Sequence, residues 1–143
     1  MPTNDRLIYQ VFMAQHRLST YLKRVLTVRG ITVTMTQAGI LFLLRQKNGQ
    51  SMSELSRALF IDNSTITGLV DRLERTGFVR RDASSGDRRM FRIYVTPQGV
   101  EESKKAKVVI KEVNGKIKSG FSNDEMEIFK RVLNGFSEKF SKE

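Results

Sequence analysis

The sequence predicts a mainly helical protein of the α+β class, in which one small two-stranded β-hairpin accompanies several α-helices. Apolar residues recur at spacings of three and four along most of the 143-residue chain, as they do on the buried face of an amphipathic helix. Between residues 78 and 95 the pattern changes to two short strand-like runs on either side of a turn-forming segment, 83–87. The length suits a single domain with its own hydrophobic core.

The first helix is expected over residues 5–28, and it ends near Gly30, since glycine commonly follows a helix. Basic residues gather toward its C-terminal end, where the helix dipole favours positive charge. The apolar positions that define this helix are Leu7, Ile8, Val11, Phe12, Leu18, Leu22, Val25 and Leu26.

Three more helices begin with Ser or Thr followed three residues later by Glu or Gln, a pair that satisfies two free backbone amides reciprocally. The first of them starts at Thr34 and stops at Asn48, and the second starts at Ser51 and covers 52–59. The third starts at Ser122 and carries one apolar stripe, formed by Met126, Phe129, Val132, Leu133, Phe136 and Phe140.

A further helix runs from a cap at Asp62 or Asn63 to Arg75, with Gly77 behind its end. Strands are expected at 78–82 and 88–95, and Thr96 followed by Pro97 begins a helix that reaches about residue 118. The order is four helices, a two-stranded ribbon and two more helices. A helix pair followed by a hairpin describes a winged helix-turn-helix.

The charge of the chain favours a nucleic-acid partner and excludes several other chemistries. Lys and Arg number 25 against 15 Asp and Glu, which gives a formal net charge of +10. The chain has no cysteine and a single histidine, His16, so disulfides, thiolate chemistry and a two-histidine metal site within one chain are excluded. No cofactor is expected. All eight basic residues of the middle third are arginines, whose planar forks suit guanine edges and phosphates.

The helix over 63–75 is the candidate recognition helix. Its inner side carries Ile66, Leu69, Val70 and Leu73, and short polar residues near its start would let the backbone approach a DNA major groove. Gly68 lies on the outer side, where it costs about 1 kcal/mol relative to alanine and no core packing explains it. The expected DNA contacts are Asn63, Ser64, Thr65, Thr67, Gly68 and Arg72.

A solvated helix face remains the alternative to DNA contact. On that interpretation Arg72 and Arg75 pair with Asp71 and Glu74 along the same helix. We assign a mixed role to Arg72 and a mainly structural one to Arg75.

The hairpin tip is the second candidate contact, because Arg88 and Arg89 stand beside flexible residues. A narrow minor groove attracts inserted arginine. We expect one of the two to enter the groove and the other to pair with Asp87, and a solvated surface hairpin is the alternative. Starts of the helices that precede the recognition helix could contact the DNA backbone through Thr36, Gln37, Ser51 and Ser53.

These residues resemble the MarR family of bacterial transcription regulators. The resemblance rests on Ser53-Glu54-Leu55-Ser56, on the run from Asp62 to Arg81 that contains Asp71-Arg72-Leu73-Glu74, on Asp87-Arg88-Arg89, and on the exit Tyr94-Val95-Thr96-Pro97-Gln98-Gly99. It implies an obligate homodimer whose terminal helices interlock, two winged domains on a palindromic operator, and control by small aromatic or phenolic ligands in many members. The cysteine-based oxidant sensing of one family branch cannot apply, and Gly68 stands where many relatives carry a larger residue, often Arg.

The resemblance divides the single domain, 1–143, into an N-terminal dimerisation helix (1–33), a DNA-binding module (34–97) and C-terminal dimerisation helices (98–143). Four phenylalanines within the last 23 positions support a dimer independently, because a small domain has little room to bury them, and a monomer with a large helical core is the alternative. In relatives an effector pocket lies between the dimerisation helices and the winged module. The corresponding positions are Met13, His16, Arg17 and Met35.

The sequence therefore predicts a sequence-specific DNA-binding regulator, a repressor released by a small effector. A non-specific architectural protein of double-stranded DNA is the alternative that the charge also allows. An enzyme is disfavoured, because the chain has no phosphate-loop pattern, no dinucleotide-binding glycine motif and no nucleophile with a nearby base. No export signal or membrane span is recognised, so we expect a cytoplasmic protein without a membrane partner.

Overall fold

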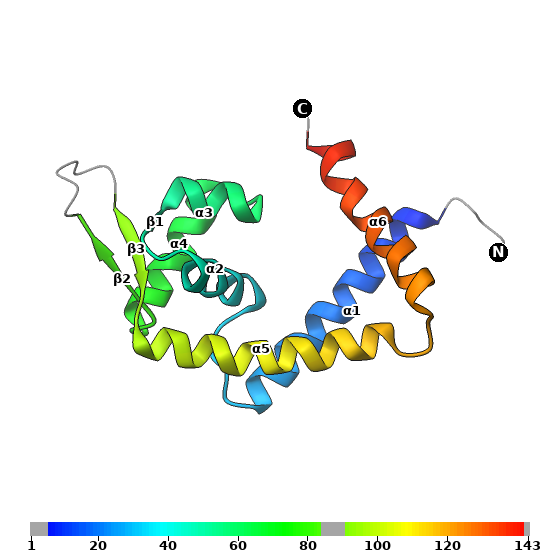
Figure 1. The fold of residues 1–143 in the computed structure, drawn as a ribbon, viewed down its shortest axis with the longest axis horizontal. Coiled ribbons are helices and arrows are strands. Elements are labelled where there is room, and N and C mark those ends of the chain that lie inside the picture. Colours follow the sequence, from blue (N-terminus) through cyan, green and yellow to red (C-terminus); the bar gives the residue numbers. More distant parts are fainter. Residues whose placement is uncertain (1–5, 84–90, 142–143) are drawn as a thin grey trace. The chain divides into compact units, whose positions relative to one another are not determined.

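The computed structural model describes residues 6–83 and 91–141, and its elements follow the predicted order (Figure 1). The elements are α1 (Leu7–Val28), α2 (Met35–Gln46), β1 (Gln50–Ser51), α3 (Met52–Leu59), α4 (Asn63–Arg75), β2 (Val79–Asp82), β3 (Arg92–Val95), α5 (Pro97–Lys118) and α6 (Asn123–Phe140). The chain forms two compact units, Met1–Val109 and Ile110–Glu143.

The core of the first unit lies where α2, α3 and α4 meet the sheet. Each of these helices turns one apolar face inward, and α4 contacts α2, α3 and β2. The side chains of this core are almost fully shielded from solvent, and the largest of them are Ile40, Leu41, Leu44, Leu55, Ile66, Val70, Leu73 and Ile93.

The predicted helix starts are confirmed. Thr34 and Gln37 form a reciprocal capping box at the start of α2, and Ser51 accepts the backbone N–H of Glu54 at the start of α3. Asp62, rather than Asn63, is the N-cap of α4. Caps are read well from sequence because the side chain and the amide that it satisfies lie three residues apart.

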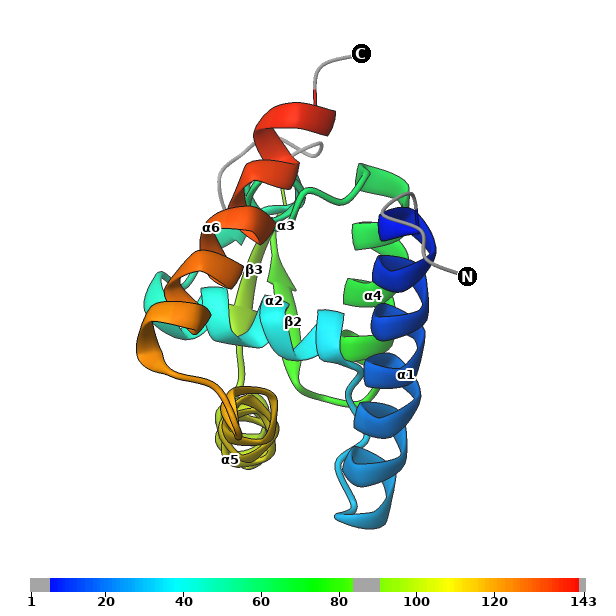
Figure 2. The same ribbon diagram turned by 90° about the vertical axis from the view of Figure 1, so that its right-hand side faces the viewer.

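The sheet has three antiparallel strands rather than the predicted two, in the order β1-β3-β2. β2 and β3 lie side by side in both views and form the expected hairpin (Figures 1 and 2). The additional strand is the pair Gln50–Ser51, which is opposite Ile93 and Arg92 of β3. Two residues are too few to show alternation, and Ser51 is at once the last residue of this strand and the cap of α3.

The start of α5 is fixed to the segment that precedes β2. Thr96 donates its backbone N–H to the Phe78 carbonyl (3.0 Å) and its hydroxyl to the Gly77 carbonyl (2.6 Å), and it accepts the N–H of Gly99 (3.1 Å). A Cβ atom at residue 99 would lie 2.1 Å from the Phe78 carbonyl oxygen. The backbone of residue 99, in the Thr-Pro-x-Gly segment after the hairpin, therefore lies so close to the Phe78 carbonyl that only glycine fits there.

The helices α1 and α6 leave most of their apolar side chains exposed. Leu26 is the one buried residue among those of α1, and none of α6 is buried. In the second unit an open hollow of about 530 Å³ is lined by Ile117, Phe121, Glu125, Met126, Ile128, Phe129 and Val132. The predicted apolar stripe of the last helix is present, and none of its side chains is buried among the residues that the structure describes.

Gly99→Ala is expected to lower the free energy of unfolding by about 2 kcal/mol, since overpacking against a fixed backbone group costs about 1–3 kcal/mol. Urea unfolding followed by circular dichroism, at one protein concentration, measures this loss. Gly115→Ala is the matched control, because a Cβ at residue 115 of α5 meets no atom within 4 Å. Equal stability of the two variants would contradict the close contact.

Candidate nucleic-acid interface

The first half of α4 presents a polar surface on a helix whose other face is fixed in the core. Ile66 and Val70 are fully buried, whereas every residue from Asn63 to Thr65, together with Thr67 and Gly68, is exposed. The structure thus places all of the predicted base-contacting positions of this helix, Arg72 included, in solvent. A rigid helix that carries short polar side chains outward fits a DNA major groove.

The Asp62 carboxylate is the centre of the polar network at the start of α4. It accepts hydrogen bonds from the Ser64 hydroxyl, from the Thr65 hydroxyl (2.7 Å) and from the Thr65 backbone N–H (3.1 Å). The Ser64 and Thr65 side-chain bonds, with the Thr65 backbone bond, lower the pKa of Asp62 from 3.8 to about 2. The carboxylate therefore stays charged at any pH near neutrality.

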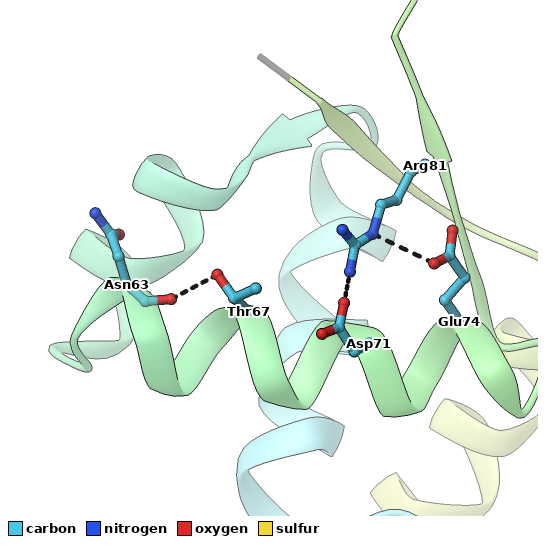
Figure 3. A network of polar contacts seen from close by, with 5 residues as sticks. All are labelled: Asn63, Thr67, Asp71, Glu74 and Arg81. Atoms are coloured by element: carbon cyan, nitrogen blue, oxygen red, sulfur yellow. Dashed lines mark hydrogen bonds and ion pairs between the residues drawn. The ribbon is translucent and has the colours of Figure 1, made fainter. Parts of the chain in front are cut away.

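Thr67 has its own partner one turn earlier in the helix. Its hydroxyl donates to the carbonyl oxygen of Asn63 at 2.8 Å, as Figure 3 shows. The Asn63 side chain points away from the helix into solvent in the same view. Asn63 therefore leaves an amide, with both donors and an acceptor, at the exposed start of α4.

Gly68 lies in open space, because a Cβ atom at this position would meet nothing within 4 Å. Neither a positive φ nor a crowded neighbour requires glycine here. Packing within the chain therefore does not account for this residue, and its proposed closeness to DNA stays a prediction.

Arg81 of β2 is the residue that sequence reasoning missed. Its guanidinium forms ion pairs with Asp71 and with Glu74 (3.4 Å), so it connects the hairpin to the recognition helix (Figure 3). The Arg81 side chain is 21% exposed, compared with 45% for Asp71 and 43% for Glu74. The sequence did contain a signal for this pairing, because two acids one turn apart on a helix are followed by a strand that carries basic residues.

The alternative interpretation, in which Arg72 and Arg75 pair with these two acids, is therefore wrong. Both arginines are exposed and form no ion pair within the part of the chain that the structure describes. They line an open hollow of about 330 Å³ beside the start of α2, together with Thr32, Thr34 and Thr76 among other residues. Arg72 therefore remains available for DNA.

The hairpin tip with Asp87, Arg88 and Arg89 lies outside the described residues, so its expected groove contact stays a prediction. Two other arginines of the hairpin have partners within the chain. The Arg80 guanidinium stacks over the Tyr94 ring at 4.5 Å, and Arg92 donates to the Gly49 carbonyl at 2.9 Å.

The residues expected to contact the DNA backbone differ in their exposure. Gln37 and Ser51 are buried and use their side chains as helix caps, and Thr36 is half-buried. Ser53 is exposed at the start of α3 and is the best placed of the four for a phosphate.

The residues predicted to line an effector pocket differ in their position relative to an open hollow of about 530 Å³ between α1 and α2. Met35 lines it, whereas Met13, His16 and Arg17 do not. The α1 residues that do line it are Gln15, Leu18, Ser19, Leu22, Lys23 and Leu26 with Thr27. Because an α-helix turns about 100° per residue, Met13 and Arg17 lie roughly half a turn away from Gln15 and Leu22.

Other kinds of site find no support in the described part of the chain. Residues 6–83 and 91–141 hold no group of three acidic or histidine side chains that could bind a metal ion. Within the same ranges no helix has the length and apolar character needed to cross a bilayer.

Comparisons with known proteins agree with this geometry. Residues 33–91 match the sequence model of the MarR family. The HTH-type transcriptional regulator TtmR of Methylorubrum extorquens is 31% identical over 96 residues, which are 67% of this chain and 48% of TtmR. The chain spans about half the length of the first curated relatives it matches, and these are named as transcriptional regulators, not as enzymes.

The fold is shared with solved regulators along nearly the whole chain. The S. aureus MepR–DNA complex superposes with a TM-score of 0.83 at 22% identity and covers 92% of this chain and 95% of the MepR chain. PcaV of Streptomyces coelicolor, solved with its natural ligand, gives a TM-score of 0.79 at 20% identity over 96% of this chain and 98% of its own.

Arg81→Met is expected to lower the free energy of unfolding by about 1–2 kcal/mol, since it removes both ion pairs and leaves two neighbouring carboxylates unpaired. A double-mutant cycle with Asp71→Asn, measured by urea unfolding, isolates the ion pair. Arg80→Met is the control, because the exposed Arg80 contacts Tyr94 (4.5 Å to the ring) and Asp82 (3.7 Å) of the hairpin itself, and neither contact reaches α4. Equal losses at positions 80 and 81 would show that Arg81 does not connect the hairpin to α4.

Proposed function

The winged helix-turn-helix of this chain, residues 33–91, is a MarR-family domain, and on that premise we propose that the protein is a sequence-specific DNA-binding transcription regulator. The observation that carries the proposal is α4, whose apolar face is buried while its polar first half is exposed. The similarity of fold to a regulator solved on DNA supports the same conclusion. Base contacts are assigned to Asn63, Ser64, Thr65, Thr67, Gly68 and Arg72.

The regulator acts as a homodimer on a palindromic operator. Support comes from the apolar side chains that α1 and α6 leave in solvent, because a monomer rarely exposes so many and a second copy of the chain would cover them. A two-fold dimer places two recognition helices on two half-sites. Two copies of a +10 chain give +20, which attracts DNA over a long range.

The wing adds contacts beside the recognition helix. Arg88 and Arg89 follow Asp87 in the segment of the sequence between β2 and β3, and we assign one arginine to the minor groove and the other to the Asp87 carboxylate. Ser53 at the start of α3 supplies a backbone contact.

Regulation is proposed to be repression that a small aromatic or phenolic effector relieves. The hollow between α1 and α2 supports this, because apolar Leu18, Leu22 and Met35 line it beside polar threonines, and its volume of about 530 Å³ suits a small molecule. PcaV, which has the same fold, was solved with its natural ligand. Such a regulator acts in the cytoplasm, where bacterial DNA lies.

A non-specific architectural DNA-binding protein is the second candidate, and the net charge favours it. The two functions differ in the ratio of affinities for selected and random duplexes. We expect a duplex selected from a random pool to bind roughly 10³-fold or more tightly than random duplex at physiological salt, as measured by fluorescence anisotropy. A ratio near one would establish the architectural function instead.

The dimer is tested at Val132, which is 53% exposed and lines the hollow of the second unit. Val132→Glu is expected to shift the protein from dimer to monomer in sedimentation velocity, because a charge would have to be buried in an apolar contact. Lys130→Gln on the same helix removes only an exposed ion pair with Glu127 (3.2 Å) and should leave the dimer intact. A dimeric Val132→Glu protein would exclude α6 from the interface.

A further inference from the structure

The three hydroxyl groups in the first half of α4 have already used their only hydrogen as donors within the chain. Ser64 and Thr65 donate to the Asp62 carboxylate, and Thr67 donates to the Asn63 carbonyl oxygen. Ionised carboxylates and carbonyl oxygens can only accept hydrogen bonds, so the direction of all three bonds is fixed. Each hydroxyl keeps lone pairs, and the two threonines also keep a methyl group.

We propose that Ser64, Thr65 and Thr67 act on DNA as hydrogen-bond acceptors, so that the recognition helix selects exocyclic amino groups in the major groove. This inference rests on the proposed function, because it concerns the bases that the same helix contacts. It assigns the role of hydrogen-bond acceptor to the three side chains. The residue types alone leave this role open, since a free hydroxyl both donates and accepts.

The bases that fit this surface follow from the pattern of the major groove. Adenine offers its N6 amino group and cytosine its N4 amino group, whereas the O6 and N7 atoms of guanine only accept. Thymine presents a methyl group, which suits the exposed methyl groups of Thr65 and Thr67. The hydroxyls therefore match the amino groups of adenine and cytosine, the threonine methyl groups match thymine, and the two acceptors at the edge of guanine oppose the hydroxyls.

Two other side chains of α4, Asn63 and Arg72, are also assigned to base contacts. The Asn63 amide carries both donors and an acceptor, so it can pair with the N6 and N7 atoms of adenine. Arg72, which suits guanine, lies nine residues after Asn63 in the sequence and therefore about 13 Å further along the helix. The donor that reads guanine is thus separated from the acceptors at the start of α4.

The arrangement persists under the conditions in which the protein would bind DNA. Asp62 has a pKa of about 2 and remains an acceptor at neutral pH, where it continues to hold the Ser64 and Thr65 hydroxyls. Thr67 is held by the backbone of its own helix, so its donor stays occupied for as long as α4 is folded.

Duplexes with single base analogues test the proposal. Binding of the full chain to a selected duplex is measured by fluorescence anisotropy. In one set of duplexes purine deoxyriboside replaces one adenine, and in another a pyrimidinone deoxyriboside replaces one cytosine. Both analogues lack the amino group. In parallel, 7-deazapurines remove N7 and retain the amino group. The same analogues placed outside the recognised site control for weaker base pairing.

Thr67→Val identifies the side chain that is responsible, because valine keeps the methyl group and removes the oxygen. We expect roughly three- to ten-fold weaker binding to the selected duplex. On the duplex that lacks the matching amino group, wild type and variant should bind equally. Thr76→Val is the matched control, since the Thr76 hydroxyl makes the same kind of bond to the carbonyl four residues earlier, at 3.0 Å, behind the C-terminal end of α4.

The outcomes separate the inference from the function on which it rests. The proposal is supported if Thr67→Val weakens binding to the selected duplex but no longer does so on a duplex from which one amino group has been removed. Loss of that effect upon removal of N7 would mean that the hydroxyl donates, and an unchanged affinity of Thr67→Val would mean that it reads no base; either result overturns the proposal while the regulator function stands. If the wild-type chain showed no sequence preference at all, both the acceptor proposal and the proposed regulator function would be overturned.

Discussion

The burial of one face of α4 is the constraint on which the candidate site depends. Ile66, Val70 and Leu73 are at most 1% exposed, and full burial of such side chains contributes about 1.5–3 kcal/mol each. The helix therefore cannot rotate about its axis without placing these groups in water. Because rotation is prevented, the opposite face has a fixed direction, and short polar side chains on it can act as a reading surface.

The hairpin is held to the same helix by charge rather than by apolar packing alone. The Arg81 side chain is partly shielded beside Asp71 and Glu74, where ion pairs are screened less by solvent than at an open surface. At the other end of the hairpin, Thr96 and Gly99 bring α5 against Phe78. Recognition helix, sheet and the start of α5 are thus connected through side chains within one unit.

Sequence reasoning succeeded where the controlling interaction is local. The caps at Thr34, Ser51 and Ser122 act over three residues, and the helices that they begin appear as predicted. It failed where partners are distant in the chain. β1 exists only because β3 lies beside it, and Asp71 pairs with an arginine ten residues away on a strand. The hydroxyl directions at α4 likewise need coordinates, because residue type does not reveal which bond a hydroxyl has made.

Asp62 has a consequence for how such a regulator can change its target during evolution. One carboxylate both caps α4 and holds the hydroxyls of Ser64 and Thr65. Under the proposed function, a substitution at either position would therefore alter folding stability and base preference together. Asn63 and Thr67 are outside this coupling, because neither side chain contacts that carboxylate. New operator preferences should therefore arise first at these two positions, with residues 64 and 65 following only once the helix start is stabilised in another way.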